Sequence, residues 1–96
     1  MGIHAGFMAV IKSCPGCGGT HALEFQCEYF GQHAKWNVGD RLCEGDWKYF
    51  PPDDFVEEYE GISSCSPAKY QHIFLKGTII IVGGVFKGIK DIAITT

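Results

Sequence analysis

Cys14 and Cys17 are separated by two residues in the segment Cys14-Pro15-Gly16-Cys17-Gly18. This spacing lets the two sulfurs converge on one point, where they either bind a metal ion or form a small disulfide. Backbone N–H groups must fold back toward the sulfurs in such a turn, and glycine tolerates the φ values that this requires. The segment therefore predicts a thiol site, and the metal-binding and redox interpretations must be weighed against each other.

A structural zinc site has four ligands, which are commonly supplied by two such turns. Cys65-Ser66-Pro67-Ala68 has a cysteine at the first thiol position of a second Cys-x-x-Cys and alanine at the second. The Cys-Pro-x-Cys-Gly pattern in Lys12–Gly18 is a rubredoxin-type knuckle, and here the chain resembles a zinc ribbon. The resemblance extends in part to Ile62–Val82, and it implies a structural zinc ion held by Cys14, Cys17 and Cys65.

The fourth zinc ligand must come from outside the two knuckles. His72 follows Cys65 by seven positions and is expected on the adjoining strand, so the predicted set is Cys14, Cys17, Cys65 and His72. Cys43 and His21 are the alternatives for the fourth position. A degenerate site, in which the core alone maintains the fold, is the remaining interpretation.

A redox role is the second hypothesis for the first cysteine pair. Cys-Pro-Gly-Cys after the apolar segment Phe7–Lys12 looks superficially like the glutaredoxin or thioredoxin motif, in which a helix N-terminus lowers the thiol pKa. Gly18-Gly19 and a strand pattern follow here in place of that helix. A dithiol redox protein using Cys14 and Cys17 is therefore the runner-up. No catalytic residue is assigned, and a non-enzymatic protein is favoured.

The elements that position these thiols are predicted to be strands. Leu23, Phe25, Cys27 and Tyr29 alternate with polar residues, which is the pattern of a strand with one buried face. Cys27 lies on the apolar side of this pattern and is interpreted as a small buried hydrophobe. Phe7–Lys12 is expected to form the strand that leads into the knuckle.

The C-terminal third is also predicted to be β. Tyr70–Leu75 and Thr78–Val82 are expected to form a hairpin with a tight turn at Lys76-Gly77. Asp53–Tyr59 is either a short helix or an acidic loop. The fold class is therefore mainly β: a small antiparallel sheet or open barrel, resembling an elaborated zinc ribbon, with at most one short helix near 53–59.

Composition limits the partners of this chain. With 96 residues, 46% of them hydrophobic and 20% charged, it is expected to form a single globular domain over 1–96. Its net charge of −3 disfavours nucleic-acid binding, so a nucleic-acid-binding ribbon using Lys69, Lys76, Lys87 and Lys90 ranks third. A protein-interaction or accessory module is favoured, with an unknown protein partner. A homodimer through unpaired strand edges would also be compatible with a small sheet.

Cysteine usage indicates the compartment. Five cysteines would leave one thiol over in a secreted disulfide framework, and no signal peptide or membrane-spanning apolar run is recognised. The sequence therefore predicts a cytoplasmic protein with reduced thiols and no membrane association.

Overall fold

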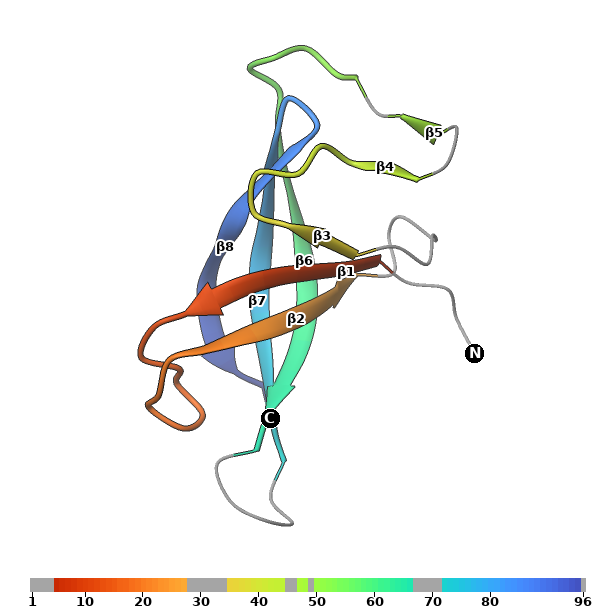
Figure 1. Ribbon diagram of the computed structural model, residues 1–96. Helices are drawn as coiled ribbons and strands as arrows, with labels where there is room; N and C mark the ends of the chain where they lie inside the picture. Colours follow the sequence, from red (N-terminus) through yellow and green to blue (C-terminus); the bar gives the residue numbers. More distant parts are fainter. Residues whose placement is uncertain (1–4, 28–34, 45–46, 49, 67–71, 96) are drawn as a thin grey trace.

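The computed structural model describes residues 5–27, 35–44, 47–48, 50–66 and 72–95. One six-stranded sheet with the order β3-β1-β2-β6-β7-β8 curls into a half-barrel (Figure 1). Its strands are β1 (Ala5–Ile11), β2 (His21–Cys27), β3 (Lys35–Asn37), β6 (Val56–Cys65), β7 (Ile73–Val82) and β8 (Val85–Ile94). A separate two-stranded sheet contains β4 (Cys43–Glu44) and β5 (Trp47–Lys48). The mainly β fold class is thus confirmed, although the parallel pairing of β1 with β3 makes the sheet mixed.

The strand that the alternating pattern predicted is present as β2. Phe25 and Cys27 are buried on the inner face, and β1 pairs with β2 in the antiparallel register Phe7↔Phe25 and Ile11↔His21. Residues separated by an even number of positions share a face of a strand, so His21 lies on the inner face with Phe25. Tyr29, the last member of the predicted pattern, lies outside the described residues.

The predicted hairpin turn at Lys76-Gly77 is wrong, because β7 runs without interruption from Ile73 to Val82. Gly77 is paired with Gly61 of β6. A Cβ atom on Gly77 would lie 3.2 Å from Cε2 of Phe25 and 2.6 Å from Cγ2 of Ile89. Glycine at this position therefore makes room for Phe25 of β2, which packs across β6 and β7. The sequence pattern alone does not distinguish a glycine with this role from a glycine in a turn.

The segment 53–59 contains no helix, and the alternative of an acidic loop holds only for its first residues. Asp53 and Asp54 form a turn, and β6 begins at Val56. Glu57 and Tyr59 are half-buried while Glu58 and Glu60 are exposed. This period of two is a strand pattern, and pairing with β7 over the whole length of β6 stabilises it despite the clustered acids.

The chain after β3 joins the two edges of the sheet at one end. The N–H of Gly39 donates to the carbonyl of Phe86, the N–H of Phe86 donates to the carbonyl of Asp40, and the N–H of Leu42 donates to the carbonyl of Gly84. Gly39 has a φ of 98°, in the left-handed region that glycine adopts readily. The turn at Gly39 therefore carries the chain from β3 to β8.

The core fills the interior of the half-barrel. The ring of Phe7 lies 5.2 Å from that of Trp36 and 4.9 Å from that of Phe86, measured between ring centroids. These contacts join β1, β3 and β8. The largest fully buried side chains are Phe7, Phe25, Phe86, Leu42, Leu75, Ile79 and Ile81.

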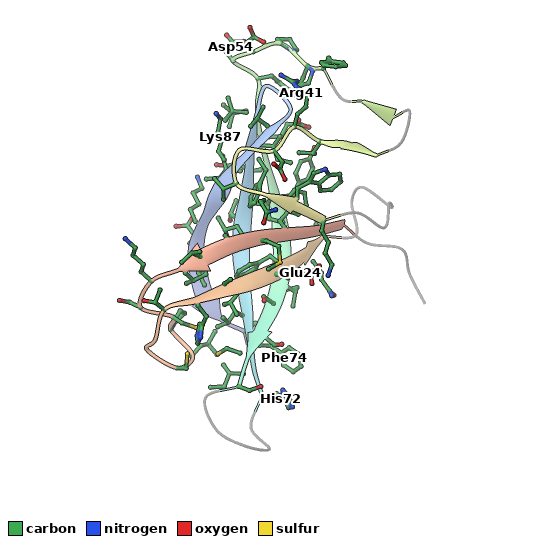
Figure 2. All side chains as sticks on the ribbon, viewed as in Figure 1. Glu24, Arg41, Asp54, His72, Phe74 and Lys87 are labelled. Atoms are coloured by element: carbon green, nitrogen blue, oxygen red, sulfur yellow. The ribbon has the colours of Figure 1, made fainter. Side chains whose placement is uncertain are left out.

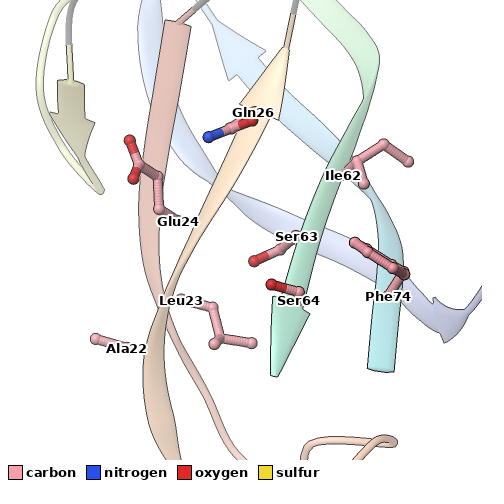
Figure 3. A pocket seen from close by; sticks show the side chains of 8 residues that line it. All are labelled: Ala22, Leu23, Glu24, Gln26, Ile62, Ser63, Ser64 and Phe74. Atoms are coloured by element: carbon pink, nitrogen blue, oxygen red, sulfur yellow. The ribbon is translucent and has the colours of Figure 1, made fainter. Parts of the chain in front are cut away.

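Between β2 and β6 the sheet has a weak seam. Gln26↔Ile62 is the single paired position that the described residues contain between these strands, whereas β6 and β7 pair along their whole length. β1 and β2 run across β6, β7 and β8 rather than alongside them (Figure 1). A hollow of about 320 Å³ opens at the seam, lined by Ala22, Leu23, Glu24, Gln26, Ile62, Ser63, Ser64 and Phe74 (Figure 3). Among the described residues, backbone pairing therefore contributes little at this seam itself.

Within the described ranges, no helix has the length and hydrophobicity that crossing a membrane would require.

Candidate metal centre

Three cysteine sulfurs meet on the inner side of the seam. Cys14 and Cys17 belong to the turn between β1 and β2, and Cys65 is the last residue of β6. Their Sγ atoms all lie within 4.8 Å of one another, and those of Cys14 and Cys65 are 3.7 Å apart. A tetrahedral zinc ion with Zn–S bonds of about 2.3 Å places two sulfurs ~3.8 Å apart. The cluster therefore has the donor atoms and the spacing of a thiolate metal site.

Backbone hydrogen bonds shape the turn that carries Cys14 and Cys17. The N–H of Gly18 donates to the carbonyl of Cys14 at 2.6 Å, and the N–H of Cys14 donates to the carbonyl of Gly19 at 2.9 Å. Gly18 has a φ of 77°, so the predicted need for glycine in this turn holds at that position. The closed turn presents both sulfurs to the end of β6.

Gly16 is expected to be essential for the approach of the turn to Cys65. A Cβ atom at this position would overlap Sγ of Cys65 and lie 3.3 Å from Cγ2 of Ile73. We expect Gly16→Ala to lower the free energy of unfolding by about 1–3 kcal/mol, as overpacking does in other cores, and chemical denaturation measures this loss. Gly19→Ala is the matched control, because its Cβ would lie 3.8 Å from Cε1 of His21, an ordinary contact. Equal losses in the two variants would contradict the close approach.

The thiols of the cluster differ in acidity. Burial raises the pKa of Cys14, but hydrogen bonds from the backbone N–H groups of Gly16 and Cys17 act in the opposite direction. Together with hydrogen bonds from two neighbouring side chains, they lower the pKa of Cys14 to about 7. Burial, followed by the hydrogen bond and the negative charge of Cys14, raises the pKa of Cys65 to about 11. Several thiolates in one buried site thus disfavour one another, and a bound cation would relieve that repulsion.

His21 lies beside this cluster. Its Nε2 atom is 2.6 Å from Sγ of Cys17, and its side chain is one of the groups that lower the pKa of Cys14. His21 is the first residue of β2, directly after the turn, and its inner-face position follows from its pairing with Ile11. The spacing of four residues from Cys17 and the phase of the β2 alternation together point to this position in the sequence. An imidazole nitrogen therefore lies next to Cys17, at the edge of the three-cysteine group.

His72 and Cys43, the other candidates for the fourth ligand, have different surroundings. His72 is exposed, and its Nδ1 atom is 3.1 Å from Oγ of Ser66 (Figure 2). In the part of the chain that the structure describes, the close group of ligand atoms contains the three cysteines and neither histidine, but His21 contacts Cys17 of this group whereas His72 contacts Ser66. Cys43 belongs to β4, and its side chain is outside the described residues. Cys27 is buried in the core with an exposed fraction of 2%, as a small buried hydrophobe would be.

The lysines proposed for nucleic-acid binding do not form an uninterrupted basic surface. Lys90 forms an ion pair with Glu58, with Nζ 2.5 Å from Oε1. Lys76 lines a shallow hollow together with Glu60 and Asp91. Lys87 is exposed on β8 (Figure 2), and Lys69 lies outside the described residues. Acidic groups thus accompany two of the lysines that would have to contact phosphates.

Comparisons with known proteins give no match: no family model matches the chain, and neither a curated protein nor a solved structure is similar to it.

Proposed function

We propose that this chain is a non-enzymatic β module stabilised by a structural zinc ion, with Cys14, Cys17, His21 and Cys65 as the ligands. The observation that carries this proposal is the convergence of the three sulfurs, from segments 48 positions apart in sequence between Cys17 and Cys65, within 4.8 Å. Three thiolates and one imidazole form a Cys₃His set, which is a common donor set of structural zinc sites. The zinc-ribbon resemblance of the first knuckle supports the same assignment.

The donor set also favours a structural role over a catalytic one. A catalytic zinc ion keeps one coordination position for water or substrate, whereas four protein ligands fill a tetrahedral site. Soft thiolate ligands select zinc over magnesium or calcium, which prefer oxygen. Because zinc binding requires thiolates, reduced cysteines and a reducing compartment such as the cytoplasm are part of the proposal.

A protein partner would be contacted through the outer face beside the seam. Val10 and Val38 are 67% and 53% exposed and line a hollow of about 290 Å³. Ile62 and Phe74 are 41% and 57% exposed and line the seam hollow, and Ala22 belongs to both hollows. Exposed apolar side chains grouped in this way are characteristic of interaction surfaces. This face is the reason for favouring an accessory role in a protein assembly.

Elemental analysis of the chain purified without a histidine tag tests the metal site. We expect about one zinc ion per chain in the wild type and substantially less after Cys65→Ser. His21→Ala is expected to weaken zinc binding by at least about tenfold, in line with the loss of one of four ligands, whereas His72→Ala is expected to leave zinc binding unchanged. Competition with a chromogenic chelator measures these affinities.

Metal-free wild-type protein would refute the zinc site. Equal zinc affinities of the His21 and His72 variants would refute the assignment of the fourth ligand. Because Cys65→Ser also alters a buried side chain, circular dichroism in excess zinc determines whether that variant is folded before its zinc content is interpreted.

A further inference from the structure

The three sulfurs of the cluster differ in their accessibility. Cys14 and Cys65 are 1% and 5% exposed, whereas Cys17 is only partly buried, at the turn between β1 and β2. A small oxidant arriving from solvent therefore meets Sγ of Cys17 first. Cys27 is 2% exposed in the core and is shielded in the same way as the two inner sulfurs.

We propose that Cys17 is a site of oxidation by hydroperoxides, and that its oxidation produces a Cys14–Cys17 disulfide, expels the metal and opens the seam between β2 and β6. This inference rests on the proposed metal site. A cysteine bound to a metal ion is deprotonated, and the thiolate is the nucleophile that reacts with peroxide. The most accessible sulfur of the cluster is thus also in a reactive form.

The oxidation proceeds in two balanced steps. The Cys17 thiolate attacks one peroxide oxygen, so that an S–O bond forms, the O–O bond breaks and hydroxide leaves. The sulfur loses two electrons to the peroxide and becomes a sulfenic acid. The Cys14 thiolate then attacks that sulfur, an S–S bond forms, the S–O bond breaks, and a second hydroxide leaves. Two thiolates and one peroxide give one disulfide and two hydroxides, and two of the metal ligands are consumed.

Cys14 is the partner because of its place in the fold. Cys14 and Cys17 share one turn, and their sulfurs lie within 4.8 Å of each other, so this disulfide requires no movement of a strand. Cys65 is then the sole sulfur on the β6 side of the cluster, and it loses its link to the turn. Since Gln26↔Ile62 is the one backbone pairing across the described part of the seam, loss of the metal leaves β2 and the end of β6 weakly connected.

The experiment uses the zinc-loaded full chain treated with hydrogen peroxide. A chromogenic zinc indicator follows metal release, peptide mass mapping locates the disulfide, and hydrogen exchange compares the end of β6 with β8. We expect release of about one zinc ion per chain, a Cys14–Cys17 disulfide, faster exchange at the end of β6, and recovery of zinc binding after reduction by dithiothreitol.

Two variants make the outcome specific to Cys17. Cys17→His keeps a zinc ligand but removes the accessible thiolate, so zinc release is expected to slow by at least about tenfold. Cys27→Ala is the matched control and should release zinc at the wild-type rate. If Cys17→His binds no zinc, mass mapping of the wild type still decides the assignment.

Three results would overturn the inference. Zinc could stay bound in excess peroxide, or Cys17→His could release it as fast as the wild type. A Cys17–Cys65 disulfide would also overturn it, because that bond would hold the two sides of the seam together. Absence of zinc before peroxide is added would instead show that the proposed function itself is wrong, and the inference would fail with it.

Discussion

Removal of zinc by a chelator is expected to lower the free energy of unfolding by about 4 kcal/mol, when free zinc in the reference sample is about a thousandfold above its dissociation constant. For a chain of 96 residues, this corresponds to a fall in melting temperature of roughly 15–30 °C. The physical reason is the seam, where one described backbone pair, Gln26↔Ile62, joins β2 to β6. The metal would link Cys65 of β6 to Cys14, Cys17 and His21 on the other side of it. Thermal unfolding with and without chelator measures the effect.

Hydrogen exchange can show which part of the fold loses stability when zinc is removed. Hydrogen exchange after chelation should rise at Ser63–Cys65 of β6. Ile79 and Ile81 of β7 should remain protected, because they are fully buried and paired on both sides. Cys65→Ser should show almost no further loss on chelation, because its metal site is already broken. A melting temperature of the wild type that chelation does not change would show that the core alone holds the fold.

Truncation of Phe7 should be the most damaging single change in the core. Phe7 is fully buried and contacts Trp36 and Phe86, so Phe7→Ala leaves a cavity where β1, β3 and β8 meet. Substitutions of buried Phe by Ala typically cost about 3–5 kcal/mol. We expect a loss of that size in the free energy of unfolding, measured by urea denaturation of the zinc-loaded protein.

Phe74→Ala provides the matched control for Phe7→Ala. The same side chain is removed, but Phe74 is 57% exposed on the outer face of β7, so the expected loss is within about 0.5 kcal/mol. Similar losses in both variants would contradict the arrangement of the core. Zinc content should remain the same in both, since neither residue is among the proposed ligands.

Local sequence patterns predicted strands correctly where a pattern had only one structural explanation. The alternation in β2 has a single explanation, because a strand with one buried face has a period of two. Gly77 has two explanations, since glycine occurs both in turns and where a neighbouring side chain packs closely. The sequence favoured the turn, and the packing of Phe25 against Gly61 and Gly77 shows that the second explanation applies.

The acidic segment at the start of β6 was misjudged for a related reason. Glu57 and Glu58 have low strand propensity, and clustered acids usually indicate a solvated loop. Strand propensity depends strongly on context, and the ten-residue pairing with β7 outweighs it. The stabilisation that pairing with a distant strand provides cannot be predicted from the segment itself.

For the candidate metal centre, the sequence determined the first knuckle: two thiols at a fixed spacing, with glycines that let the turn close. It also indicated Cys65 as a third sulfur. Tertiary structure alone decided that Cys65 reaches the knuckle and that His21, rather than His72, lies beside it. Both depend on strand order and register, because β6 lies next to β2 in the sheet and Ile11↔His21 sets the face of the imidazole. Spacing along the chain fixes only local geometry, whereas ligands from distant strands meet through the folding of the whole sheet.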